Sequence, residues 1–167
     1  GERNDLLAFL GRPLTDPRVA AGLAPFDAPT LYSQSANRPL AYGAPTAGTL
    51  GNPVFIANEP PLLGNPSMTM GVDRAQPNAR ALLIIDRAED APGSTVRGVQ
   101  CFLGLTAAQM RTVVQLDAAG TGSANTAIPN SSSLHGLTVF AQWFIEDAGG
   151  PAGVSATDAR AITLFMN

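Results

Sequence analysis

Short runs of strand-forming residues, separated by turn residues about every ten positions, constrain this sequence more than any other feature. Each run is bounded by Gly, Pro, Asn or Asp, and the 17 glycines and 14 prolines are spread along all 167 residues. Many short strands joined by tight turns are typical of antiparallel β-sandwiches. The strands that we expect cover residues 53–57, 67–72, 81–85, 99–103, 112–116, 122–128, 137–145 and 161–165.

The predicted fold is therefore all-β, an antiparallel β-sandwich of about eight strands, immunoglobulin-like or jelly-roll-like in type. The continuous apolar run 81–85 is typical of a strand in the middle of such a sandwich. We expect the core to contain Leu83, Ile85, Val114, Val139, Ala141 and Trp143.

The predicted strand 137–145 is apolar on both faces. Alternation places Trp143 and Ile145 on one face, and Phe140 and Phe144, with Gln142 between them, on the other. One face belongs to the core, so the other needs a cover. That cover is the edge of the second sheet, the N-terminal segment or another subunit, and the pattern alone does not decide among them.

Residues 1–40 have a different character from the rest. Residues 4–11 read as a short helix with an Asn or Asp cap and a Gly stop, residues 18–23 as a second helical turn or two, and residues 24–32 as an extended stretch. This segment has too few periodic apolar residues to build its own core. We therefore divide the chain into an N-terminal arm, residues 1–40, and a sandwich domain, residues 41–167.

Several large apolar side chains of this arm need a surface to cover them. We expect that surface to be a neighbouring subunit, with docking on the same chain as the alternative. The hypothetical assembly interface consists of Leu6, Leu7, Phe9, Leu10, Phe26, Leu31 and Tyr32 of the arm, with Phe140 and Phe144 of the sandwich.

The composition excludes several classes of function. With 45% hydrophobic and 14% charged residues the chain is not expected to be disordered. A net charge of −3 gives no electrostatic footprint for nucleic acid. The longest apolar run is far too short for a membrane-spanning helix.

No catalytic, metal or cofactor site is predicted, and we do not expect an enzyme. The only histidine, His135, follows the polar loop Ser131–Ser133, and Asp117 or Asp147 would be the third member of a Ser-His-Asp triad. The loop lacks the nucleophile-elbow motif that such a triad needs. One histidine and one cysteine, Cys101, do not make a zinc site. The acidic groups near Asp86 and Asp147 lack a calcium-loop spacing, which favours solvated turn acids.

Residues 42–167, about three quarters of the chain, resemble a C-terminal β-sandwich module of secreted and surface proteins of environmental bacteria. An ordered set of short motifs carries this resemblance: Tyr42-Gly43, Gly64-Asn65-Pro66, Ala81-Leu82-Leu83, Cys101-Phe102-Leu103, Asp117-Ala118-Ala119-Gly120, Ile128-Pro129, Gly136-Leu137 with Phe140-Ala141-Gln142-Trp143, Asp147 and Ser155.

The resemblance implies a sorting, display or structural appendage without established catalytic residues. It also implies a second cysteine directly after the Tyr-Gly motif, able to pair with the cysteine of the Cys-x-Leu strand. Here Ala44 and Pro45 follow Gly43, so Cys101 has no such partner. The chain is expected to be held together by packing alone or by contacts with its neighbours.

These observations favour a secreted, extracellular structural protein of the cell surface that assembles with copies of itself into a filament, sheath or layer. The alternative is an extracellular adhesion or carbohydrate-binding module, because exposed aromatic side chains such as Trp143 or Phe140 would stack on sugars. A glycan is a possible further partner through the acceptor pattern at Asn130. Nucleic acid and a membrane span are not expected.

Overall fold

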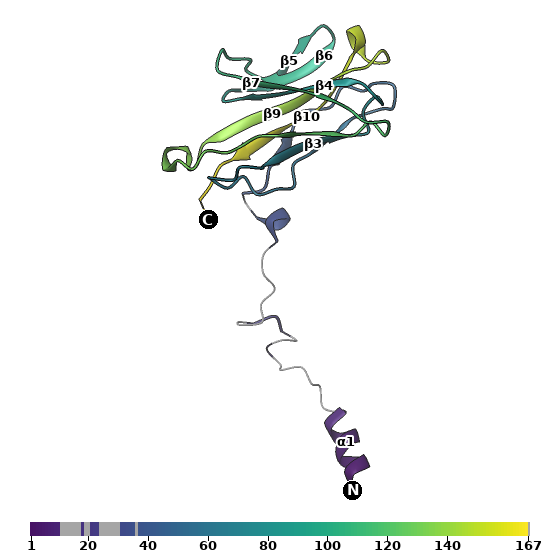
Figure 1. The fold of residues 1–167 in the computed structure, drawn as a ribbon, viewed down its shortest axis with the longest axis vertical. Helices are drawn as coiled ribbons and strands as arrows, with labels where there is room; N and C mark the ends of the chain where they lie inside the picture. The colour runs from purple at the N-terminus through teal and green to yellow at the C-terminus, as the bar shows by residue number, and fades with distance from the viewer. Residues whose placement is uncertain (11–17, 19–20, 24–30, 36, 167) are drawn as a thin grey trace. The chain divides into compact units, whose positions relative to one another are not determined.

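A computed structural model describes residues 1–10, 18, 21–23, 31–35 and 37–166. The chain divides into two compact units, Gly1–Gln34 and Ser35–Asn167. The second unit is built from strands and contains the antiparallel sandwich that the sequence predicts (Figure 1). No helix in the described ranges is long and apolar enough to cross a membrane.

A five-stranded antiparallel sheet forms the centre of the second unit. Its strands lie in the order β1 (Leu40–Tyr42), β10 (Val154–Thr163), β9 (Thr138–Glu146), β4 (Arg80–Asp86) and β7 (Met110–Gln115). In the register of β9 with β4, Trp143 lies opposite Leu83 and Ala141 opposite Ile85. These pairs place Leu83, Ile85, Ala141 and Trp143 on the same face of the sheet.

A three-stranded sheet covers that face. It consists of β2 (Val54–Ile56), β3 (Thr69–Asp73) and β8 (Gly122–Asn125) in the order β2-β3-β8. Between the sheets, Leu83, Ile85, Ala141 and Trp143 are buried, while Val114 and Val139 are half-buried and pack against the same cluster. All six predicted core residues therefore belong to the core.

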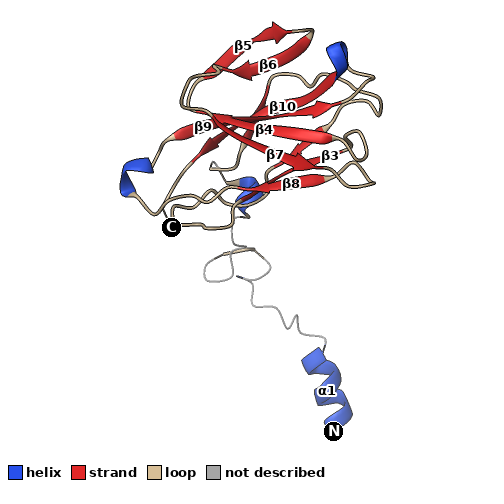
Figure 2. Cartoon of the chain, turned by 45° about the horizontal axis from the view of Figure 1, so that its top comes forward, coloured by secondary structure: helices blue, strands red, loops and turns tan. Residues whose placement is uncertain are grey.

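The hairpin of β5 (Glu89–Val96) and β6 (Val99–Leu103) forms a third layer on the opposite face of the central sheet (Figure 2). Cys101 and Leu103 of β6 form a second apolar cluster with Ile84, and Phe140 and Phe144 pack against it. The second apolar face of β9 is thus covered, at least in part, by a hairpin of the same chain.

The structure differs from the predicted strands chiefly at four places. β10 begins at Val154 rather than at residue 161, β8 ends at Asn125 rather than at residue 128, and β1 and β5 were not predicted. The early part of β10 is made of small and polar residues, and a bulge between Ala156 and Ala159 interrupts its register with β9. β5 has an exposed, Gly- and Pro-containing sequence, so neither segment shows the apolar alternation of a strand.

The first unit contains α1 (Glu2–Leu10) and the short 3-10 helix η1 (Tyr32–Gln34). α1 begins two residues earlier than predicted, and the amides of Asn4 and Asp5 donate to the carbonyl of Gly1. Of the second helical segment expected at residues 18–23, the structure describes residues 18 and 21–23, where the amide of Leu23 donates to the carbonyl of Arg18 (2.8 Å). Of the extended stretch expected at residues 24–32, residues 24–30 lie outside the described part of the chain. Two further 3-10 helices, η2 (Ser132–Leu134) and η3 (Pro151–Gly153), lie in loops of the second unit.

Candidate functional site

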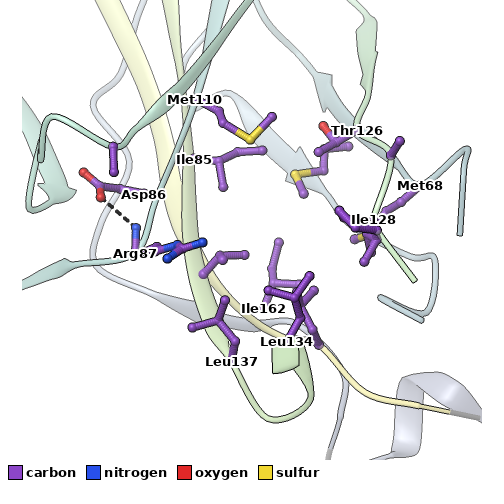
Figure 3. A pocket seen from close by; sticks show the side chains of 16 residues that line it. Met68, Ile85, Asp86, Arg87, Met110, Thr126, Ile128, Leu134, Leu137 and Ile162 are labelled. Carbon is purple, nitrogen blue, oxygen red and sulfur yellow. Dashed lines mark hydrogen bonds between the residues drawn. The ribbon is translucent and has the colours of Figure 1, made fainter. Parts of the chain in front are cut away.

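An apolar cavity of about 280 Å³ opens between the two sheets at one end of the sandwich (Figure 3). Both sheets contribute to it, together with the loop between β8 and β9. Its lining includes Met68, Met70, Ile85, Met110, Thr126, Ala127, Ile128, Leu134, Leu137, Val139 and Ile162. With almost no polar group facing inward, the cavity suits apolar side chains or an apolar ligand far better than water.

Two turns that lie side by side hold one wall of this cavity. The amide of Ile128 donates to the carbonyl of Asn65 (2.8 Å), and the amide of Gly64 donates back to the carbonyl of Ile128 (3.1 Å). Gly64 has a φ of +82°, which favours glycine, and its turn is the Gly-Asn-Pro motif noted in the sequence. The wall is therefore fixed by backbone hydrogen bonds before any partner binds.

The polar rim of the cavity consists of Asp86 and Arg87. The Asp86 carboxylate is only 1% exposed and accepts hydrogen bonds from the amide and hydroxyl of Thr106 (both 2.6 Å) and from the amide of Arg87 (2.7 Å). Burial alone would raise the pKa of Asp86, but these hydrogen bonds outweigh burial and hold the pKa below its usual value. Asp86 is thus a buried anchor of the β4–β5 and β6–β7 loops.

Arg87 faces the cavity, whereas the Asp86 carboxylate turns the other way (Figure 3). The Arg87 side chain is exposed, and within the described part of the chain it forms no ion pair. The cavity therefore combines an apolar interior with one exposed guanidinium at its mouth, which forms no ion pair in the described part of the chain.

A second constellation lies under the hairpin, where side chains bind the free edge of β6. Gln142 accepts from the amide of Phe102 (3.0 Å) and donates to the carbonyl of Gln100 (3.0 Å). The hydroxyl of Thr46 accepts from the amide of Gln100 (2.9 Å), and the hydroxyl of Tyr42 donates to the carbonyl of Phe102 (3.0 Å). The hairpin is therefore fixed to the central sheet by polar bonds as well as by its apolar cluster.

Sequence reasoning missed this polar contact because it counted Gln142 as one member of an apolar face. The feature that could have indicated this contact is Gln142 itself, a glutamine between Phe140 and Phe144. A buried glutamine side chain almost always has hydrogen-bond partners. Burial also raises the pKa of the Tyr42 phenol, and the nearby charge of Glu89 adds to the effect. The phenol therefore remains a hydrogen-bond donor at ordinary pH.

The predicted interface residues of the arm occupy exposed positions where the structure describes them. Leu6 and Leu7 of α1 are 57% and 58% exposed, and Leu31 is 59% exposed. Tyr32, at the start of η1, is half-buried, and burial raises its pKa to about 12. The side chains of Phe9, Leu10 and Phe26 lie outside the described part of the chain.

The two interface residues predicted on the sandwich, Phe140 and Phe144, are half-buried beneath the hairpin. The Phe140 ring also meets the Tyr42 ring edge to face, with centroids 6.0 Å apart. Trp143 is 0% exposed, so its ring is not available to stack on a sugar. Trp143 therefore gives no support to a carbohydrate-binding face.

The residues considered for catalysis are engaged in separate local contacts. His135 Nδ1 accepts from the amide of Met166 (3.3 Å), the Asp117 carboxylate binds Thr121 in its own turn, and Asp147 binds Thr49. Asp147 is 3% exposed, so Asp147 and Asp86 are not the solvated turn acids that the sequence favoured.

The structure also shows where the possible metal ligands and the single cysteine lie. In the described ranges, no three His, Cys, Asp or Glu side chains are grouped to hold a metal ion. Cys101 is a buried free thiol, as predicted from its apolar surroundings, and burial raises its pKa.

No protein-family model, curated protein or solved structure matches this chain.

Proposed function

We propose that this chain is a non-catalytic extracellular structural protein that assembles with copies of itself into a surface filament, sheath or layer. The N-terminal arm makes the contact between subunits. Two observations carry the proposal. The described core residues of the sandwich all lie between Phe55 and Leu164, and α1 has two leucines, Leu6 and Leu7, that are more than half exposed.

The sandwich is closed by its own residues. Both apolar clusters draw their buried members from residues between Phe55 and Leu164. The third layer over β9 is also supplied by the sandwich unit itself. Among the residues that the structure describes, the arm contributes no buried member to either cluster.

α1 gains little stability as an isolated helix. It has nine residues, and helices shorter than about 12–15 residues are marginal in water. Its two exposed leucines, Leu6 and Leu7, would each contribute about 1.5–3 kcal/mol if a partner buried them fully. A contact of this size is weak by itself, so a stable array requires each subunit to take part in several such contacts.

The resemblance of residues 42–167 to a module of secreted and surface proteins supports the extracellular location. The low proportion of charged residues, 14%, is compatible with a surface that packs against other copies. No sugar-binding function is proposed, since the tryptophan that suggested it is enclosed in the core.

Deletion of residues 1–34 tests the proposal. We expect the full chain to form regular assemblies in electron micrographs, and the truncated chain to remain a folded monomer with a β-type circular dichroism spectrum. Leu6→Asp is the matched point variant, and Ala8→Asp, which adds the same charge to an exposed position of the same helix, is its control. Unchanged assembly of the truncated chain, or its failure to fold, would overturn the proposal.

A further inference from the structure

We propose that the apolar cavity between the two sheets receives α1 of a neighbouring copy. Leu6 enters the cavity, and the acidic residues Glu2 and Asp5 lie at its rim against Arg87. The inference rests on the proposed function, because it names the surface to which the arm binds.

The cavity has the size and the chemistry for a few side chains. Its volume of about 280 Å³ is roughly nine times the share of one water molecule in the liquid, about 30 Å³. A whole helix, about 10 Å across, does not fit. A helix lying over the mouth with one or two apolar side chains inserted does fit, which is the usual way an amphipathic helix binds a groove.

α1 carries the complementary pattern. Leu6 follows Glu2 by four positions, and Asp5 follows Glu2 by three, so the three side chains lie on neighbouring rows of one helix surface. That surface presents an exposed leucine beside the carboxylates of Glu2 and Asp5, and Arg3 lies three positions before the same leucine. The cavity presents an apolar interior beside one guanidinium without an ion-pair partner in the described part of the chain.

A second apolar surface competes for the helix and fits it less well. Val113 of β7 is 54% exposed and lies in a hollow with Leu82 and Phe144. The cation at that hollow, Arg80, is already paired with Glu146 (3.6 Å). A helix that brings two carboxylates would meet an arginine that is already paired there, whereas Arg87 at the cavity mouth has no ion-pair partner in the described part of the chain.

Cysteine cross-linking in the full-length chain tests the contact. Ala127 lines the cavity and is exposed, so Ala127→Cys adds a thiol at the mouth with little change in volume. In the variant Leu6→Cys with Ala127→Cys, mild oxidation of assembled protein is expected to give a ladder of linked chains on a non-reducing gel. The control pair Leu6→Cys with Val113→Cys is expected to give none.

Each other outcome overturns the inference. A single band of monomer mass that runs faster than the reduced chain would mean that α1 docks on its own sandwich. A ladder with the Val113 pair alone would place the helix on β7. No linkage in either variant would place it elsewhere.

A charge exchange adds an independent readout. We expect Arg87→Glu to raise the concentration needed for assembly roughly fivefold, the effect of losing about 1 kcal/mol at a rim charge. Glu2→Arg with Asp5→Arg in the same chain is expected to restore it, and Arg97→Glu, at an exposed turn outside the cavity, to leave it unchanged.

The two proposals fail separately. If deleting residues 1–34 prevents assembly while cross-linking and the charge exchange have no effect, the arm is the connector but the cavity is not its receptor. If the deletion leaves assembly intact, both proposals fall.

Discussion

Gln142 supports the most informative stability test in this molecule. Its side chain is fully buried under the β5–β6 hairpin and makes three hydrogen bonds, to Phe102, Gln100 and Thr157. Gln142→Leu keeps nearly the same side-chain size and removes all three. The substitution therefore isolates the polar contribution from the packing of the second apolar cluster.

The magnitude follows from the groups that lose their partners. The Phe102 amide and the carbonyls of Gln100 and Thr157 would remain without these bonds, and each such loss costs about 1–3 kcal/mol when the group stays buried. Because Leu gains some favourable burial and the three effects are not additive, we expect the free energy of unfolding to fall by about 3–5 kcal/mol.

Urea unfolding followed by the fluorescence of Trp143, the only tryptophan, measures this change. Hydrogen exchange at the Phe102 amide reports the same bond locally and is expected to accelerate in the variant. Gln100→Leu is the matched control, because that side chain bonds only Thr95 at an exposed position and its loss is expected to cost within about 0.5 kcal/mol. A loss below about 1 kcal/mol for Gln142→Leu, with unchanged exchange at Phe102, would refute the reasoning.

The remaining predictions concern acid stability, a crowded glycine and the thiol. The folded protein lowers the pKa of Asp86 and of Asp147. Both carboxylates therefore stabilise the fold fully above about pH 4–5, and this stabilisation is lost as the pH falls through the folded pKa. Asp86→Asn is expected to reduce the fall of the urea unfolding midpoint between about pH 5 and pH 3. Gly43→Ala is expected to destabilise the fold by more than Gly136→Ala. Both glycines have a positive φ, but a Cβ added at Gly43 would lie 2.6 Å from the Phe102 ring, whereas one added at Gly136 would face open space. Equal melting temperatures of the two variants would contradict this. Cys101 is expected to react with a thiol reagent far more slowly in native than in urea-unfolded protein, and rapid native labelling would show that the hairpin opens readily.

The central strands of this fold could be predicted because their buried positions carry apolar residues at the spacing of a strand. β4 and β9 carry apolar side chains on both faces, and the structure packs Leu83 and Trp143 against one sheet and Ile84 and Phe140 against the hairpin. Alternation identifies both faces of such a strand, but it does not identify what covers each one. That information depends on contacts between residues about 40 positions apart, such as Gln142 with Phe102.

The segments that the sequence did not predict share a physical reason. β5 is exposed and polar, and the first half of β10 is buried through Ser155, Ala156 and Thr157, whose small side chains give no strand pattern. The cavity also has no sequence signature, because it forms where the loop after β8 closes one end of the sandwich incompletely. Its one recognisable component was the Gly-Asn-Pro turn that fixes its wall.

The side chains bound along β6 also bear on how copies of this protein can associate. A strand at the edge of a sheet normally offers unpaired amides and carbonyls that template a strand from another molecule, which is the route to cross-β aggregates. At Gln100 and Phe102 those groups are occupied by Thr46, Gln142 and Tyr42. At these two residues the edge cannot pair with a strand of another molecule, so any contact made there would be through side chains.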